Sequence, residues 1–250
     1  EGMPATLLHA IHFIFAAANY SGAVYSGLTT GAARLIISFG SGELKQMFLL
    51  PMLEGKWQGT MALTEPEAGS SLGDLETLAR PLGDGRYAVS GEKIFISAGD
   101  HDGVDNVVHL MLARIDGAPA GTRGISLFAV PKFRPDGTGG LEDNDVTTTQ
   151  IFHKLGYRGA PITGLRMGDK DNCIGFLVGK ENRGLSYMFQ MMNGARLEVG
   201  MGATAIATAA YHAALDYCRT RRQGRRLADK KGGPQVPIIS HPDVRRMLLF

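Results

Sequence analysis

Apolar residues repeat at helical spacing near the beginning of the chain. Residues 5–18, ATLLHAIHFIFAAA, and residues 42–54, GELKQMFLLPMLE, have this spacing, and the second run puts Leu44, Met47 and Phe48 on one face. The sequence therefore predicts that residues 1–56 are mostly helical. The first run has about fourteen residues, fewer than the roughly 20 that a membrane span needs, so we expect a buried helix and no membrane span.

From Trp57 to about Val178 the pattern changes to short apolar runs, separated by Gly, Pro, Asp or Asn. The runs are WQGTMAL, RYAVSG, EKIFIS, NVVHLMLARI and GISLFAV. They predict a compact β domain. Residues 131–145, PKFRPDGTGGLEDND, are rich in Pro and Gly and are expected to form a mobile surface loop within it.

A second helical pattern covers residues 185–223, which contain no proline and are apolar on almost every face. A helix of this kind is expected to be buried among other helices. The chain begins and ends within helical patterns, which suggests a piece of a longer protein. The order of helix, sheet and helix predicts an α+β fold.

Composition and charge are those of an ordinary soluble protein. The 250 residues are 44% hydrophobic and 20% charged, enough for a substantial core in one or two domains. The formal net charge of +2 gives little reason to expect nucleic-acid binding. Cys173 and Cys218 lie far apart and the histidines are scattered, so we expect neither a disulfide framework nor a metal site, and a reducing, cytoplasmic location is favoured.

The stretch from Met61 to Ser70, MALTEPEAGS, ends a predicted strand with a tight turn. Leu63 closes the strand, Pro66 fixes the turn, and Gly69 precedes a hydroxyl among unhindered backbone N–H groups. Such a turn suits a phosphate or another anion. An ordinary strand-to-loop turn has the same features, so the turn alone does not decide between the two.

Three further motifs follow this turn in order: GEKIFISAG from Gly91, NGARLEVG from Asn193 and YCRTRRQG, which ends at Gly224. Together with the Thr-Glu-Pro-x-Ala-Gly-Ser turn they resemble the acyl-CoA dehydrogenase family, over roughly residues 35 to 228. The stretches GKWQGTMALTEPEAGSSLGDL and VGKENRGLSYMFQMMNGAR are most similar to the larger members, which include the 3-methylmercaptopropionyl-CoA dehydrogenases.

The resemblance implies an acyl-CoA dehydrogenase-like fold in three parts. Residues 1–56 would be the C-terminal part of a helical domain, residues 57–181 a middle domain that resembles a β-barrel, and residues 182–250 the first helices of a four-helix-bundle domain.

The resemblance also implies that FAD binds at the turn. The backbone around Leu63 and the hydroxyl of Thr64 would meet the pyrimidine side of the flavin ring. Ser70, just after Gly69, would face the FAD pyrophosphate or the CoA arm of the substrate.

Two residues of the KIFIS run would complete the flavin site. Phe95 takes the position of an aromatic residue, often Trp, that packs against the flavin, and Ser97 replaces the usual Thr that hydrogen-bonds flavin N5. Without the resemblance, Phe95 would be one face of a strand, between Ile94 and Ile96, and Ser97 would cap the strand end.

Arg221 and Gln223 match an Arg-x-Gln pair that family members send to the FAD pyrophosphate of a neighbouring subunit, which implies a homodimer or homotetramer. A guanidinium suits two phosphate oxygens. Gly224 stands where a Phe commonly follows, so the adenosine end of the pocket departs from the family pattern. The alternative is that positive charge stabilises a helix C-terminus.

For the substrate, the resemblance puts Asn193 and Arg196 near the active site. Arg196 is alone in an apolar helix, and we expect a buried guanidinium with a partner. Most family members carry the catalytic glutamate in the C-terminal helical domain, so the base is expected beyond Phe250. A minority carry it just before this arginine, where the chain has Ala195, and Glu198 is the alternative base.

The implied reaction is FAD-dependent α,β-dehydrogenation of an acyl-CoA in fatty acid metabolism (β-oxidation), with electrons passed to an electron-transfer flavoprotein. Three other functions fit the same fold: a flavin monooxygenase or nitroalkane oxidase, a DNA-damage-response member and a non-catalytic FAD-binding remnant. The near-neutral net charge argues against the DNA-damage-response function. The sequence does not indicate the acyl group.

Overall fold

Two strands of almost continuous apolar sequence form the middle of the main sheet. β4 (Asn106–Ile115) and β5 (Ile125–Pro131) are antiparallel, and nearly all of their residues are buried. A strand that is covered on both faces needs apolar residues throughout, which explains the absence of alternation in NVVHLMLARI. The computed structural model describes residues 3–229 and 232–250, and it confirms both strands at the predicted positions.

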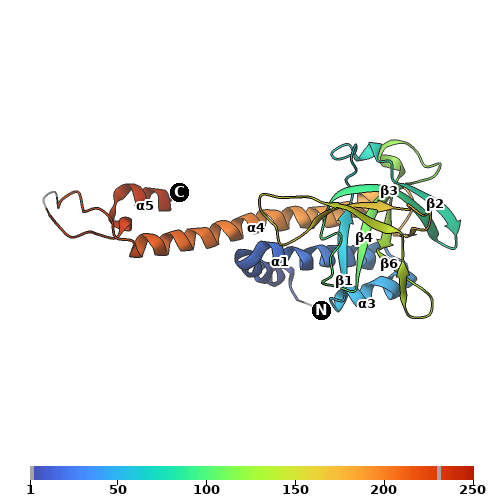
Figure 1. Cartoon of the computed structure of the whole chain (residues 1–250), viewed down its shortest axis with the longest axis horizontal. Coiled ribbons are helices and arrows are strands. Elements are labelled where there is room, and N and C mark those ends of the chain that lie inside the picture. The colour runs from blue at the N-terminus through green and yellow to red at the C-terminus, as the bar shows by residue number, and fades with distance from the viewer. Residues whose placement is uncertain (1–2, 230–231) are drawn as a thin grey trace. The chain divides into compact units, whose positions relative to one another are not determined.

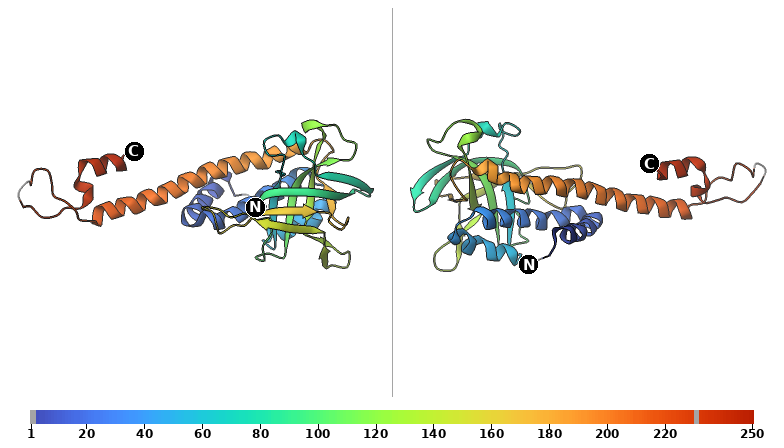
Figure 2. Two further views of the ribbon diagram at one scale, coloured as in Figure 1. Left: turned by 45° about the horizontal axis from the view of Figure 1, so that its top comes forward. Right: turned by 180° about the vertical axis from the view of Figure 1, so that it is seen from behind.

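In the described part of the chain, the main sheet has eight strands and closes on itself. Its order is β1-β4-β5-β10-β3-β9-β8, and β2 pairs with both β3 and β4. Pairing therefore runs in a closed ring through β4, β5, β10, β3 and β2, and the ribbon curves accordingly (Figures 1 and 2). The remaining bounds are β1 Trp57–Ala62, β2 Leu78–Gly83, β3 Arg86–Ser97, β8 Val146–Ile151, β9 Ile162–Met167 and β10 Ile174–Leu177.

A cluster of buried apolar side chains joins the strands of this ring. Its members come from every strand of the ring except β10, and they include Ala79, Val89, Met111 and Phe128. The predicted β-barrel-like middle and the α+β fold class are confirmed.

Helix α1 (Ala5–Phe39) packs on β1 through its second half. The backbone of Asn19 is not helical, with φ −156° and ψ 92°, so the helix is kinked there. Beyond the kink, Ala32 lies so close to Gly59 of β1 that a methyl group on this glycine would collide with it. Gly59 N–H also donates to Thr29 Oγ1 at 3.2 Å, which fixes the helix against the strand.

The helix predicted over residues 42–54 is present in three consecutive pieces. These are α2 (Gly42–Leu44), a π-helical turn η1 (Lys45–Leu49) and α3 (Leu50–Leu53). Leu44, Phe48 and Met52 are buried in the core that α1 and β1 share. The predicted apolar face is therefore the one that packs.

The first run of the chain is helical but is not buried, contrary to the prediction. Leu7, Leu8, Ile14 and Phe15 are all exposed, because apolar composition leads to burial only where other elements cover the helix. The helix is also longer than the run suggested. Thr6–Phe39 is long and apolar enough to cross a membrane by length and composition, a criterion that core helices of soluble proteins also meet.

The segment 131–145, predicted as a loop, contains a small hairpin. β6 (Phe133–Pro135) pairs with β7 (Leu141–Asp143). The prediction missed it because both strands are short and Pro and Gly surround them. Arg134 ties the two strands of the hairpin together and to the rest of the domain. Its guanidinium donates to Glu142 Oε1 at 2.6 Å and to the Asn172 carbonyl at 2.7 Å.

A second compact unit consists of Glu1–Tyr20 and Val199–Phe250, as far as its residues are described. It contains the second half of α4 (Gly184–Thr220), the turn η4 (Ile238–Ser240) and α5 (Pro242–Leu248). Gly202 of α4 meets the ring of Tyr20 with no room for a side chain.

The expectation that α4 is buried on most faces is wrong for this chain. Leu197, Val199, Ile206, Tyr211 and Tyr217 are exposed. The physical reason is the same as for the first run: no other described element covers these faces.

The two compact units divide the chain differently from the three predicted segments. Ser21–Glu198 forms one unit, because the second half of α1 and the first half of α4 pack with the sheet. The sheet itself begins at Trp57 and ends at Leu177, within the predicted 57–181 segment. The three-segment division stays a prediction.

A histidine is buried in the middle of the sheet. His109 of β4 is fully buried, its Nδ1 lies 2.7 Å from Thr60 Oγ1, and its Nε2 has no hydrogen-bond partner among the described residues. Burial lowers the pKa of His109 to about 4, against the opposing charge of Asp100. The folded protein therefore holds this imidazole in its neutral form.

We expect His109 to make folding sensitive to acid. A histidine in the unfolded chain takes up a proton near its ordinary pKa of 6.5, but the folded protein resists it until about 4. The stabilising contribution is thus complete above pH 6.5 and is lost as the pH falls towards 4. Denaturant unfolding of the complete protein at about pH 7 and about pH 4.5 should show a smaller loss of stability for His109→Gln than for the wild type. The exposed His153→Gln is the control, and an equal loss in all three proteins would contradict the assignment.

Candidate functional site

The turn after β1 and the end of β3 line one cavity of about 300 Å³. Five of the residues predicted to bind FAD are among its lining: Leu63, Thr64, Gly69, Phe95 and Ser97. Residues 63–69 and 95–97 are brought together because β3 passes beside the turn, and Ile94 N–H donates to the Thr64 carbonyl at 2.9 Å.

The Thr-Glu-Pro turn is closed by its own backbone. Glu65 and Ala68 exchange two hydrogen bonds, of 3.0 and 3.2 Å, and Pro66 lies exposed between them. This closure leaves Thr64 and Gly69 side by side at its base, with 3.9 Å from the Thr64 methyl group to a Cβ added at Gly69. Ser70 follows outside the turn, is exposed, and is not among the described residues that line the cavity.

Phe95 stands on a bulge of β3. The register of β3 against β9 shifts between Lys93 and Ile96, and Phe95 has φ 60°, in the left-handed region that few non-glycine residues adopt. Its side chain is 55% exposed, unlike the buried Ile96 beside it. The bulge turns the aromatic ring out of the sheet.

A second aromatic ring supports Phe95, and the sequence analysis missed it. Phe152, just after β8, packs against Phe95 with ring centroids 4.6 Å apart. Its backbone N–H donates to the Ile162 carbonyl, which ties it to β9. No motif of the sequence pointed to Phe152, because the contact depends on the pairing of β8 with β9 and of β9 with β3.

Two hydroxyl groups of the cavity are available to a ligand. The side chains of Thr64 and Ser97 line it, and neither hydroxyl has a hydrogen-bond partner among the described residues. Two carbonyl groups nearby each accept a hydrogen bond, Leu63 O from Lys93 and Thr64 O from Ile94. Thr64 of the turn and Ser97 of β3 each offer a hydroxyl to the cavity.

A buried ion pair lies behind the turn. Lys93 Nζ is 2.6 Å from Glu65 Oε1, and both side chains are buried. Burial lowers the pKa of Lys93 to about 8, although Glu65 opposes this shift. Burial alone would raise the pKa of Glu65, but Lys93 and the hydrogen bonds from Thr77 and Glu76 lower it, so the carboxylate stays ionised.

Helices α1 and α4 complete the cavity with apolar side chains. Leu28 of α1 and Met192 of α4 line it, together with Met61 and Leu72. The cavity thus has an apolar side and a side with hydroxyls, as sites for small molecules commonly do.

The predicted residues of α4 lie next to Met192 but are not part of the lining. Arg196 is exposed, so the expectation of a buried guanidinium is wrong. It donates to Asn193 Oδ1 at 2.8 Å and lies over the ring of Phe189, 5.9 Å from its centre. The guanidinium needs no buried partner because it is exposed to solvent and keeps its hydration.

Glu198, the alternative base, packs against α1. A methyl group on Gly27 would lie 2.7 Å from Glu198 Oε2. Glu198 is not among the described residues that line the cavity.

Arg221 and Gln223 lie in the other compact unit, directly after α4. Gln223 N–H donates to Val236 O, and Ile238 N–H donates to Arg221 O, so the chain returns in a tight strand-like pairing. The two predicted side chains point to each other, with Arg221 Nη2 at 3.5 Å from Gln223 Oε1, and both are exposed.

A cationic cavity adjoins this pair within the same unit. It has a volume of about 370 Å³, and its lining is Arg226, Leu227, Ser240, His241, Pro242 and Arg245. His241 Nε2 lies 2.8 Å from the Gln223 carbonyl. The sequence analysis missed these residues, although the run of arginines at 221–226 was visible.

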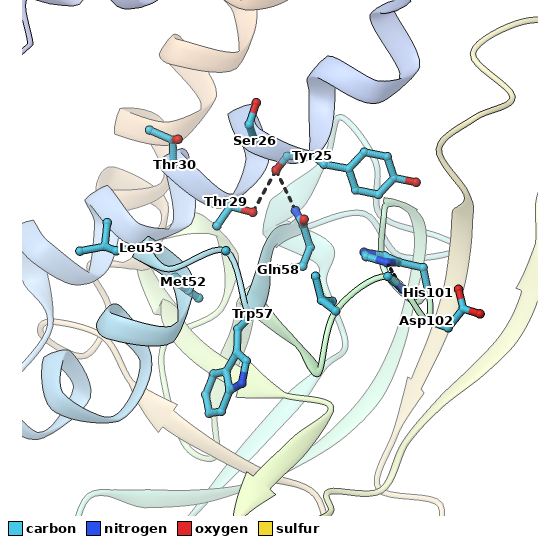
Figure 3. A pocket seen from close by; sticks show the side chains of 13 residues that line it. Tyr25, Ser26, Thr29, Thr30, Met52, Leu53, Trp57, Gln58, His101 and Asp102 are labelled. Atoms are coloured by element: carbon cyan, nitrogen blue, oxygen red, sulfur yellow. Dashed lines mark hydrogen bonds between the residues drawn. The ribbon is translucent and has the colours of Figure 1, made fainter.

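Figure 3 shows a larger cavity. It measures about 570 Å³ and is lined by residues of α1, α3, β1 and the loop from His101 to Val104. Three of its hydroxyls donate within the protein: Tyr25 to Gly159 O, Ser26 to Ala23 O and Thr29 to Tyr25 O. None of the residues predicted to bind FAD lines it.

Two protein-family models match the chain, and one of them covers the residues of the turn and of β3. Residues 60–170 match the family model described as acyl-CoA dehydrogenase, middle domain, and residues 182–249 match acyl-CoA dehydrogenase, C-terminal domain. The chain belongs to the acyl-CoA dehydrogenase family. The predicted family is confirmed.

Named relatives of this family align with most of the chain. A butyryl-CoA dehydrogenase of Syntrophomonas wolfei subsp. wolfei is 47% identical over 231 residues, which are 89% of this chain and 38% of that protein. A 3-methylmercaptopropionyl-CoA dehydrogenase of Ruegeria pomeroyi is 46% identical over 250 residues, 99% of this chain and 42% of that protein. The chain therefore spans about two fifths of the length of these relatives.

A solved structure also matches the fold. The butyryl-CoA dehydrogenase from Megasphaera elsdenii superposes with a TM-score of 0.75 at 25% identity, over 95% of this chain and 56% of that one.

The residues of the 300 Å³ cavity fit a flavin ring. A flat heteroaromatic ring needs an apolar face and hydrogen-bond donors at its edge. The cavity provides the exposed ring of Phe95 and the hydroxyls of Thr64 and Ser97, which bond to no other residue that the structure describes. The roles of the individual residues stay predictions.

Proposed function

We propose that the complete protein is an FAD-dependent acyl-CoA dehydrogenase, which converts an acyl-CoA thioester to the trans-2-enoyl-CoA. The observation that carries the proposal is the single cavity in which the Thr64 turn meets the Phe95 bulge and two helices. Family membership supports the same reaction.

In this proposal FAD supplies the acceptor for the hydride that leaves the β-carbon. Phe95 presents its ring to the flavin, and Thr64 and Ser97 donate hydrogen bonds at the edge of the flavin. Leu28, Met61 and Met192 exclude water from the space where the acyl chain lies beside it. Ser70 and Asn193, both exposed and outside the lining, contact the CoA arm.

The substrate and partners are part of the proposal. The names of the two aligned relatives suggest short acyl groups, butyryl or 3-methylmercaptopropionyl. An electron-transfer flavoprotein receives the electrons, the protein is a cytoplasmic homodimer or homotetramer, and Arg221 and Gln223 reach the FAD pyrophosphate of the neighbouring subunit.

Bleaching of the flavin tests the reaction. Under anaerobic conditions the complete protein, purified with FAD, should lose its flavin absorbance on addition of butyryl-CoA or 3-methylmercaptopropionyl-CoA. If the complete protein binds no FAD, the proposal is wrong. The monooxygenase or oxidase alternative predicts two other results. The flavin keeps its absorbance with both thioesters, and oxygen rapidly reoxidises it during turnover of another substrate.

Arg221→Ala should weaken FAD binding roughly ten- to hundred-fold, because a charge-assisted hydrogen bond contributes about 1.5–3 kcal/mol. Titration of the apoprotein with FAD measures the change. Arg219→Ala is the matched control, since Arg219 is in the last turn of the same helix and makes a 3.7 Å surface contact with Asp216. Equal small effects of both variants would assign Arg221 to the helix C-terminus instead.

Glu198→Gln should leave reduction of the flavin by acyl-CoA nearly unchanged. The Glu198 carboxylate packs against Gly27 of α1 and does not line the cavity, so we expect the base beyond Phe250. Stopped-flow reduction in the complete protein measures the rate. Loss of a general base lowers turnover by about 10²- to 10⁴-fold. A fall of this size with FAD still bound would make Glu198 the base.

A further inference from the structure

The buried pair of Lys93 and Glu65 joins the two segments that line the cavity. Lys93 Nζ donates to Glu65 Oε1 at 2.6 Å and to the Leu63 carbonyl at 3.0 Å. Lys93 comes from β3 and the other two residues from the end of β1 and its turn. One ammonium group therefore holds both the backbone and a side chain of the opposite segment.

The Glu65 carboxylate accepts three hydrogen bonds besides the one from Lys93, and two of them reach the same oxygen, Oε1. Oε1 accepts from Thr77 Oγ1 at 2.5 Å and from Thr77 N at 3.1 Å, and Oε2 accepts from Glu76 N at 2.6 Å. These bonds come from the segment that leads into β2. The carboxylate thus links three segments at one point, with the hydrogen bonds that a buried ion pair requires.

The pair sits beside the bulge that displays Phe95. The regular pairing of β3 with β9 stops at Lys93 and resumes at Ile96, and in the gap Ile94 N–H donates to the Thr64 carbonyl instead. Lys93 and Ile94 therefore hold three consecutive residues of the turn, 63–65. The next residue of β3 is Phe95, whose left-handed φ of 60° needs support from its surroundings.

Stability alone does not account for this arrangement. A buried ion pair commonly contributes no more than an apolar pair of similar volume, because both charges lose their hydration. A buried polar network that is fully hydrogen-bonded makes its surroundings rigid and favours one arrangement, because hydrogen bonds are directional and apolar contacts are not.

We propose that Lys93 and Glu65 are positioning residues of the cavity, which hold the Thr64 hydroxyl and the Phe95 ring in a fixed relation for the flavin. The proposal rests on the proposed FAD site for its functional meaning. The geometric part, that the pair locks the bulge to the turn, does not depend on any ligand.

The main test is the double variant Glu65→Gln/Lys93→Met in the complete protein. It removes both charges, preserves most of the volume and leaves no unpaired buried charge. In the protein without FAD, hydrogen exchange of the Ile94 amide should accelerate at least about tenfold relative to the amides of β4, which report global unfolding. Unchanged relative protection of Ile94 would overturn the geometric part.

The second readout is FAD binding to the same variant. We expect an affinity at least about tenfold weaker and a shifted visible spectrum of any bound flavin, which a loss of overall stability would not cause. Wild-type affinity and spectrum would overturn the positioning role. If the wild-type protein itself binds no FAD, the proposed function fails, whereas the exchange measurement still decides whether the pair locks the bulge.

Two further variants complete the design. Glu54→Gln/Lys56→Met removes a surface pair at 2.7 Å and should change neither readout. Thr77→Val removes one hydrogen bond to Glu65 without removing a charge, so it remains informative if the double variant does not fold. It should accelerate exchange at Ile94 by a smaller factor, and wild-type protection in Thr77→Val would count against the proposal.

Discussion

The desolvation of two opposite charges constrains how the turn, β3 and the entry to β2 meet. Lys93 and Glu65 lie in the protein interior at 2.6 Å, and neither is tolerable there without the other. Their hydrogen bonds reach Leu63, Thr77 and Glu76, so the buried polar groups of the three segments satisfy one another where the segments meet. The cavity forms where these segments meet, next to the charges but not lined by them.

Much of the fold followed from local patterns. β4 and β5 are recognisable because continuous apolar runs of strand length are rare outside a covered sheet, and the helix over 42–54 because Leu44 and Phe48 share a face. β8 was not predicted, although Val, Thr and Ile favour strands, because VTTTQI has no continuous apolar run and no alternation of apolar and polar positions. The apolar pattern of the first helix could not predict its exposure, because a helix face is buried only where another element covers it.

The sequence predicted several residues that line the candidate site, but it did not predict the backbone geometry there. The order of the motifs brought Thr64 and Ser97 together, and both line the cavity. The alternation around Phe95 indicated a regular strand, but the structure has a bulge there, beside the contact of Lys93 with Leu63, which is 30 positions away in the sequence. Arg196 was misjudged because an isolated charge in an apolar helix was taken to be buried, while the helix surface beside Asn193 is open.

The backbone at Phe95 restricts which amino acids can occupy this position. A left-handed φ is unfavourable for any residue with a Cβ atom and most of all for one that branches there, so Val, Ile and Thr are poor replacements even though they are common in strands. Trp and Tyr place the same demands on the backbone as Phe and preserve a flat ring. Glycine and asparagine would relax the chain but remove the ring. Mutational tolerance at this position is therefore narrow for a conformational reason, and a library that varies only side-chain size here would mostly sample strained backbones.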